Sequence, residues 1–198
     1  MLAAVLATTI RARLDSVTFP VGRALSRAGV TANVLTAVGL AGMLGAAALI
    51  GAGRFGAGAG VLIGAALADL FDGAVAKSTA SATAWGAFFD SVVDRVGDAA
   101  LFGAIAWRFR VTEPRITAVA MATLVLAFLV SYVKARAEGV GFVCQGGLAE
   151  RAERVILLEI GLLFGILEGA LWALLALTAV TLAQRTLMVW RQAAAAPR

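Results

Sequence analysis

Long apolar runs, broken by short charged segments, limit what this chain can fold into. Of its 198 residues, 61% are hydrophobic, whereas apolar residues make up about 45–50% of an ordinary soluble domain. A run of about 20 apolar residues crosses the hydrocarbon core of a bilayer as a helix. The sequence therefore predicts an all-α integral membrane protein, a single domain over residues 1–198 with its transmembrane bundle over 33–190. We expect about six spans, at residues 33–53, 56–76, 83–107, 116–137, 152–168 and 170–190.

The first 28 residues have a different pattern. They alternate apolar side chains with Arg11, Arg13, Arg23 and Arg27, so no run is long enough to span a bilayer. This pattern is typical of an amphipathic helix on the membrane surface. No small-residue cleavage site follows a compact apolar core, so a secretory signal is not expected.

The span expected at 152–168 is the one most interrupted by charge. Arg151, Glu153, Arg154 and Glu159 delay its apolar stretch, and Gly169 is expected to form a tight turn into the last span.

The distribution of positive charge predicts the orientation of the bundle. Cytoplasmic loops of membrane proteins carry an excess of Lys and Arg. With the N-terminus in the cytoplasm, only Arg54, Arg108, Arg110 and Arg115 of the 17 Lys and Arg residues lie outside. We therefore expect a multi-pass membrane protein with a cytoplasmic N-terminus; a place in the bacterial inner membrane is implied only by the family resemblance given below.

Composition excludes several kinds of chemistry. The chain has no His and one Cys, so it has no intramolecular disulfide and no His-based metal site or acid–base catalysis. Its net charge of +5 comes from residues that separate apolar spans and form no continuous basic stripe. Nucleic-acid binding is therefore not expected, and anionic lipid or phosphate is the better partner.

Four carboxylates lie where two of the apolar runs meet. Asp69 and Asp72 are near the end of one run, and Asp90 and Asp94 are near the start of the next. A charge at membrane depth costs roughly 2.5–3.5 kcal/mol, so a cation is expected to hold the group. Residues three or four apart share a helix face, which places each pair together. Carboxylates without His or Cys favour Mg²⁺, Mn²⁺ or Ca²⁺ over zinc.

Two other interpretations of the acids remain open on spacing alone. Each Asp could be a helix-end charge in the headgroup zone. The set could also be the conduction site of a metal or ion transporter, although a transporter is expected to place such acids near the midplane. Here the acids gather at one face, on the same side as basic residues suited to phosphate.

The spacing of the acidic segment carries a family resemblance. The pattern Asp69-x2-Asp72-Gly73-x2-Ala76-Lys77-x8-Gly86-x3-Asp90-x3-Asp94 resembles the signature of the CDP-alcohol phosphatidyltransferases. Lys77 stands where the family usually has Arg, which keeps the charge but loses the bidentate fork. The resemblance implies that CDP-diacylglycerol is the donor and CMP the leaving group.

Several residues outside the acids are implied to bind the donor. Thr31-Ala32-Asn33-Val34-Leu35-Thr36 resembles the family's entry segment, with Ala32 in place of Pro; its Thr31 or Asn33 could equally serve as a helix N-cap. Gly73 and Gly86 lack side chains beside the acids, so a bulky ligand can approach the backbone. The expected donor-binding residues are Asn33, Thr36, Gly73, Lys77, Thr83 and Gly86.

A second, basic segment resembles the phosphatidylinositol phosphate synthase branch of that family, which takes inositol 1-phosphate as acceptor. Residues 131–138 and 146–154 carry the likeness, and several cations in one pocket suit a dianionic phosphate. Positive charges flanking spans are the alternative explanation. The expected acceptor-phosphate residues are Lys134, Arg136, Arg151, Arg154 and, by family analogy, Arg185.

The resemblance also implies a mechanism and partners. Asp69, Asp72 and Asp90 are expected to hold Mg²⁺, or Mn²⁺, on the donor diphosphate, with Asp94 as a further ligand. Asp94 is expected to be the catalytic base that takes the proton of the attacking hydroxyl. A homodimer and an active site facing the cytoplasm are implied as well. A phosphatidylglycerol phosphate synthase using glycerol 3-phosphate, and a catalytically inactive binding protein, are the remaining alternatives.

Overall fold

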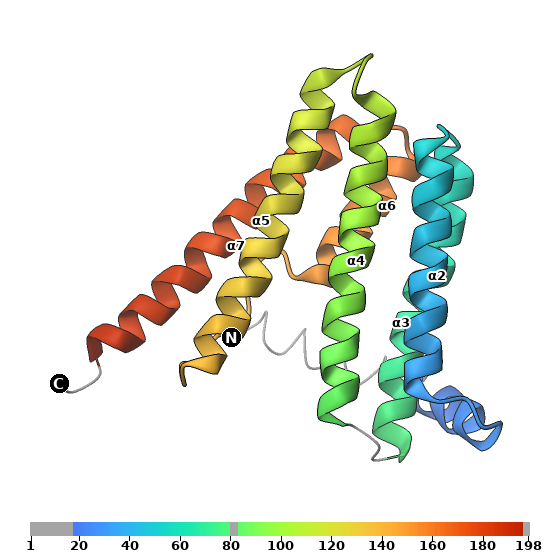
Figure 1. The fold of residues 1–198 in the computed structure, drawn as a ribbon, viewed down its shortest axis with the longest axis vertical. Helices are drawn as coiled ribbons and strands as arrows, with labels where there is room; N and C mark the ends of the chain where they lie inside the picture. The colour runs from blue at the N-terminus through green and yellow to red at the C-terminus, as the bar shows by residue number, and fades with distance from the viewer. Residues whose placement is uncertain (1–17, 80–82, 196–198) are drawn as a thin grey trace. The chain divides into compact units, whose positions relative to one another are not determined.

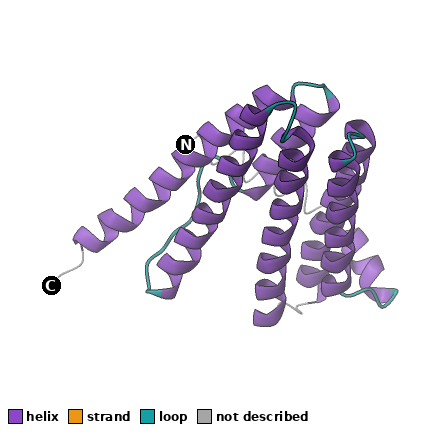
Figure 2. Ribbon diagram, turned by 45° about the horizontal axis from the view of Figure 1, so that its top comes forward, coloured by secondary structure: helices purple, strands orange, loops and turns teal. Residues whose placement is uncertain are grey.

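The computed structural model describes residues 18–79 and 83–195, which form helices joined by loops, without strands (Figure 2). Residues 18–27 are helical, whereas the rest of the surface helix expected over 1–28 lies mostly outside the described residues. The longer helices follow in chain order (Figure 1): α2 (Ala32–Gly51), α3 (Phe55–Thr79), α4 (Ala84–Phe109), α5 (Pro114–Gly139), α6 (Arg151–Leu163) and α7 (Leu167–Ala195).

The prediction of an all-α membrane protein is confirmed, with a difference in the number of spans. Four of the described helices are long and apolar enough to cross a membrane: α2, α3 over Phe55–Lys77, α5 and α7. Helix α4 has 26 residues but carries five charged side chains. Helix α6 has only 13 residues, a length of about 20 Å at 1.5 Å per residue against a hydrocarbon core of about 30 Å. The six expected spans correspond to helices α2 to α7, and four of these meet the criterion of length and composition.

The connection between the last two helices also differs from the prediction. Helix α6 ends at Leu163, five residues before the expected end of its span. The turn is made at Gly165, whose φ of +70° lies in the left-handed region that favours glycine. Gly169 lies inside α7, which begins at Leu167. The prediction of a turn at Gly169 was therefore wrong. Glycine is tolerated within a helix, and it indicates a turn only where the backbone has a positive φ, as at Gly165.

The chain divides into two compact units, and the division falls within α2, α3 and α4. The first unit comprises Met1–Leu44 and Val61–Gly97. In it, the helix over 18–27 packs closely on α3, since a Cβ at Gly22 would lie 2.7 Å from the carbonyl carbon of Ala74. Helix α2 approaches α3 in the same way, where a Cβ at Gly42 would lie 2.9 Å from the Cβ of Ala65. Small residues therefore let these helices pack with their backbones close together.

The second unit comprises Gly45–Gly60 and Asp98–Arg198. Helix α7 packs against both α5 and α6, and its Leu171 and Leu174 are fully buried. The start of α3 meets the end of α4, where the rings of Phe55 and Phe109 stack 5.9 Å apart. Arg154 of α6 pairs with Asp98 of α4 at 2.8 Å, and their side chains are 3% and 5% exposed. This ion pair joins α4 to α6 inside the apolar core of the unit.

Removal of Asp98 is expected to destabilise the protein strongly. Breaking a buried ion pair leaves an uncompensated charge and costs about 3–5 kcal/mol. Asp98→Ala should therefore lower the free energy of unfolding, measured in detergent or nanodiscs, by about that amount.

The exposed pair of Arg115 and Glu168 provides the matched control. It has a similar distance, 2.7 Å, but its side chains are 68% and 42% exposed, and an exposed pair contributes about 0–1 kcal/mol. Glu168→Ala should change little. The double variant Asp98→Leu/Arg154→Met should recover much of the loss, because an apolar pair replaces the charges. Equal effects of Asp98→Ala and Glu168→Ala would contradict this account of the core.

Candidate active site

Three carboxylates of the first unit come together between two helices. Asp69 and Asp72 lie one turn apart on α3, and Asp90 lies near the start of α4. One oxygen from each of the three lies within 4.8 Å of the others. Their side chains are half-buried, so the mutual repulsion of three negative charges is only partly screened by water. A cation is the ordinary way to stabilise such a group.

The donor chemistry of this group fits a divalent metal. Three carboxylates supply hard oxygen ligands, and His or Cys, which would favour zinc, is absent from this set. Three protein ligands leave coordination positions for phosphate oxygens, as is common for Mg²⁺ sites that bind nucleotides. Asp69, Asp72 and Asp90 are therefore suited to hold a metal together with a phosphorylated ligand.

Asp94 lies one turn further along α4 and does not belong to the group of three. It is half-buried, and its Oδ2 atom is 3.6 Å from an Nη atom of Arg95. The structure thus separates Asp94 from the three acids that approach one another most closely, whereas the sequence placed all four in one set.

Thr36, in the first turns of α2, contacts the acidic group directly. Its hydroxyl donates a 2.6 Å hydrogen bond to Oδ2 of Asp72, and the side chain is buried. The same oxygen is 3.0 Å from the carbonyl of Ala32. The bond fixes the orientation of the Asp72 carboxylate. Sequence analysis placed Thr36 among the donor-binding residues but gave no signal for this contact, because it joins residues 36 positions apart.

Three of the expected donor-binding residues gather at the start of α4. The hydroxyl of Thr83 accepts a 3.0 Å hydrogen bond from the backbone N–H of Gly86, an N-capping contact. A Cβ at Gly86 would lie 3.2 Å from that hydroxyl and 3.5 Å from Oδ1 of Asn33. Gly73, by contrast, faces open space, and Lys77 is exposed in the last turn of α3. All of these residues belong to the first unit.

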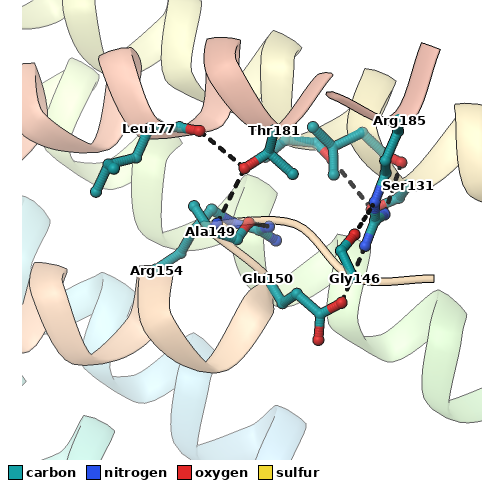
Figure 3. Close-up of polar contacts among 10 residues, drawn as sticks. Ser131, Gly146, Ala149, Glu150, Arg154, Leu177, Thr181 and Arg185 are labelled. Carbon is teal, nitrogen blue, oxygen red and sulfur yellow. Dashed lines mark hydrogen bonds and ion pairs between the residues drawn. The ribbon is translucent and has the colours of Figure 1, made fainter. Parts of the chain in front are cut away.

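The expected acceptor residues all lie in the second unit, and they fall into two classes. Lys134 and Arg151 are half-buried and Arg136 is exposed. Arg154 and Arg185 are buried, and the guanidinium group of each bonds to a protein carboxylate. Figure 3 shows the contact of Arg185 with Glu150. Arg154 donates to Asp98 and, at 3.4 Å, to the carbonyl of Ala149. Asp98 was not among the predicted residues, although its position four residues after Asp94 repeats the spacing of the acids on α4.

Arg185 of α7 has three partners in the same unit. Its Nε donates to the carbonyl of Gly146 at 3.0 Å, and one Nη donates to the carbonyl of Val130 at 3.0 Å. The other Nη donates to Glu150 at 3.2 Å. Figure 3 shows the guanidinium between α7 and the connection that precedes α6. Arg185 therefore ties α5, α7 and the α5–α6 connection together.

Comparison with known proteins decides the family. The sequence model of CDP-alcohol phosphatidyltransferase matches residues 29–190. The chain belongs to that family. The match includes both the three-carboxylate group and the basic residues of the second unit.

Relatives of known sequence and structure agree with this assignment. The chain is similar to phosphatidylinositol phosphate synthase of Mycolicibacterium smegmatis, with 36% identity over 187 residues, 88% of this chain and 84% of the relative. The enzyme of the same name from Corynebacterium glutamicum is 39% identical over 179 residues, 85% of this chain and 82% of the relative.

A crystal structure of Mycobacterium tuberculosis phosphatidylinositol phosphate synthase with CDP-DAG bound superposes with a TM-score of 0.81 and 32% identity, covering 88% of this chain and 94% of that one. A second structure of that enzyme, in complex with manganese and citrate, has a TM-score of 0.80 with 32% identity over 87% of this chain and 88% of that one. The expected family, the all-α membrane fold and a transferase that depends on a divalent metal are confirmed.

Loss of the Thr36 hydroxyl is expected to weaken metal binding. Removing the hydrogen-bond partner of a metal ligand typically costs 10- to 100-fold in metal affinity. Thr36→Val should raise the Mn²⁺ concentration at half-saturation by roughly that factor, measured by electron paramagnetic resonance of the purified protein. Thr186→Val is the control, since the exposed Thr186 bonds only within its own helix, to the carbonyl of Leu182 at 2.9 Å. Equal Mn²⁺ affinities in the two variants would show that the Thr36–Asp72 bond does not support the metal site.

Proposed function

We propose that this chain transfers the phosphatidyl group of CDP-diacylglycerol to inositol 1-phosphate, giving phosphatidylinositol phosphate and CMP. The observation that carries the proposal is the group formed by Asp69, Asp72 and Asp90, with carboxylate oxygens within 4.8 Å of one another. The choice of substrates is supported by relatives that bear the name phosphatidylinositol phosphate synthase and by the CDP-DAG complex of a similar structure.

The first unit is proposed to bind the donor. Asp69, Asp72 and Asp90 hold the divalent cation, for which we infer Mg²⁺ with Mn²⁺ as a substitute. When bound, the cation supplies Lewis-acid stabilisation of the charge on the donor diphosphate and on departing CMP. Thr36 keeps the Asp72 carboxylate in a fixed orientation. Asn33 and Thr83, which both lie near Gly86, offer polar groups to the cytidine, and Gly73 leaves open space for the diphosphate.

Asp94 is proposed as the general base. It lies on α4 one turn beyond Asp90 but outside the closest group of carboxylates. A carboxylate at this position can accept a proton from the attacking inositol hydroxyl, and its place as a further metal ligand remains part of the proposal. Its carboxylate lies 3.6 Å from the guanidinium of Arg95.

The second unit is proposed to bind the acceptor. Lys134, Arg136 and Arg151 are at least partly accessible, and each can donate charge-assisted hydrogen bonds to a phosphate. Arg154 and Arg185 are buried, and they complete the proposed set. A dianionic acceptor uses this positive charge, whereas free inositol cannot.

The location and the oligomeric state of the enzyme are proposed as well. We infer a multi-pass protein of the bacterial inner membrane, with one membrane domain over residues 1–198. The active site faces the cytoplasm, in agreement with the excess of Lys and Arg expected on that side. The active form is proposed to be a homodimer.

Purified protein in nanodiscs should release CMP from CDP-diacylglycerol in the presence of inositol 1-phosphate and Mg²⁺. Chelation of the metal should stop the reaction, and inositol 1-phosphate should have a higher kcat/KM than free inositol or glycerol 3-phosphate. Radiolabelled acceptor recovered in the lipid fraction measures the transfer.

The alternatives give different results in the same assay. A faster reaction with glycerol 3-phosphate would show a phosphatidylglycerol phosphate synthase and overturn the choice of acceptor. Metal flux across proteoliposomes without CMP release would overturn the transferase assignment.

Asp94→Asn is expected to abolish turnover while it preserves donor binding. Loss of a general base typically lowers the rate by about 10²- to 10⁴-fold, and the three closest carboxylates remain. The rate of CMP release and the Kd for CDP-diacylglycerol, measured with the same preparation, separate the two effects. Asp69→Asn is the comparison, since loss of a metal ligand should weaken donor and Mn²⁺ binding. Near wild-type turnover of Asp94→Asn would remove Asp94 from the base role, and loss of donor binding would make it a metal ligand.

A further inference from the structure

The three hydrogen-bond partners of the Arg185 guanidinium differ in how easily they can separate from it. Two of them are backbone carbonyls, of Gly146 and Val130. The third is the carboxylate of Glu150, and this contact is an ion pair at 3.2 Å. The Arg185 side chain is 5% exposed, whereas that of Glu150 is 42% exposed. The Glu150 carboxylate can therefore move into water without exposing other buried side chains.

Three residues of α7 bind the backbone of the connection that carries Glu150. Gln192 exchanges two hydrogen bonds with the backbone of Val143, at 3.0 and 2.6 Å. Arg185 binds the carbonyl of Gly146. The hydroxyl of Thr181 accepts a 2.9 Å bond from the N–H of Ala149 and donates to the carbonyl of Leu177 (Figure 3).

Gly147 makes the close approach to α7 possible. Its φ of +147° lies in the left-handed region, and a Cβ there would lie 2.5 Å from Cγ2 of Thr181. The connection before α6 is therefore packed directly on α7. Release of Glu150 from Arg185 needs only a rotation of the Glu150 side chain, because these backbone contacts do not depend on it.

The other buried arginine of the proposed acceptor set provides a contrast. Arg154 pairs with Asp98, and both side chains are at most 5% exposed. Removal of Asp98 from that pair would bury an uncompensated charge. Arg154 is therefore suited to keep Asp98 as its partner when the acceptor is bound, whereas the Arg185–Glu150 pair is suited to exchange.

We propose that Glu150 is the resident counter-ion of Arg185 and that the acceptor phosphate displaces it. A phosphate oxygen replaces the carboxylate on the same Nη of Arg185, so the guanidinium keeps an anionic partner in both states. Glu150 competes with the acceptor and so sets the acceptor affinity. This inference rests on the proposed function, because it takes Arg185 as a residue of the acceptor site.

Glu150→Gln keeps the size of the side chain but removes the competing charge. In full-length protein in nanodiscs, this variant should lower the acceptor KM by roughly two- to fivefold, the effect expected of an ion pair with one partly exposed member. The inhibition constant of inorganic phosphate against the acceptor should fall by a similar factor, and the donor KM should not change. Glu153→Gln is the matched control, since Glu153 is exposed in the first turn of α6, and it should behave like wild type.

A double variant tests whether the effect passes through Arg185. In an Arg185→Gln background, Glu150→Gln should no longer improve phosphate affinity, because the contact for which the two anions compete is gone. An acceptor KM that rises in Glu150→Gln would show that Glu150 holds Arg185 in its binding geometry, and an unchanged KM would show that the two anions do not compete. Either result would overturn the proposal.

Thermal unfolding keeps this test separate from the proposed reaction. Inorganic phosphate should raise the unfolding temperature of Glu150→Gln more than that of wild type, a comparison that needs no turnover. If wild type fails to transfer phosphatidyl groups to inositol 1-phosphate, the proposed function fails. The phosphate titration would still show whether Glu150 and phosphate exclude each other, and equal shifts in the two proteins would overturn the exchange.

Discussion

The fold depends on compensating charge within apolar helices. A lone charge in hydrocarbon costs a few kcal/mol, yet α3 and α4 carry Asp69, Asp72, Asp90, Asp94 and Asp98. Asp98 is neutralised by a guanidinium at 2.8 Å. Three of the others come within 4.8 Å of one another, which provides ligands for a divalent cation. Both the Asp98 carboxylate and the three clustered carboxylates therefore need a positive partner. For Asp98 this partner is a side chain of the protein, whereas the cluster offers its oxygens to a bound cation.

The same need for a partner of opposite charge distinguishes the arginines of the second unit. Arg154 has a partner about as deeply buried as itself, whereas the Glu150 side chain that faces Arg185 is 42% exposed. A buried pair resists separation because each member would lose its only compensation. A pair with one exposed member can exchange that member for another anion. The phosphorylated acceptor proposed for this chain fits the second kind of pair, and the first kind fits the stability of the core.

Close helix packing makes these charge contacts possible. Glycines at positions 22, 42 and 147 let neighbouring segments approach to distances that a Cβ would prevent. At Gly147 the approach brings the connection before α6 onto Thr181 and Arg185. Without that contact, the buried guanidinium of Arg185 would lose the carbonyl of Gly146. Small residues thus stabilise this fold in two ways: they allow van der Waals packing of the helices, and they allow polar groups to come within hydrogen-bond distance.

The sequence by itself determined the membrane fold, the helix positions to within a few residues, and the family. These follow from local properties: the length of apolar runs, the three- and four-residue spacing of the acids, and a motif contained in 26 residues, from Asp69 to Asp94. It did not determine the turn at Gly165, the Thr36–Asp72 bond, or the partners of Arg154 and Arg185. Periodicity states which face of a helix a side chain lies on, but the residue opposite that face is decided by packing between segments far apart in the chain. The separation of Asp94 from the three closest acids and the difference between the two arginine pairs were therefore decided only by the tertiary structure.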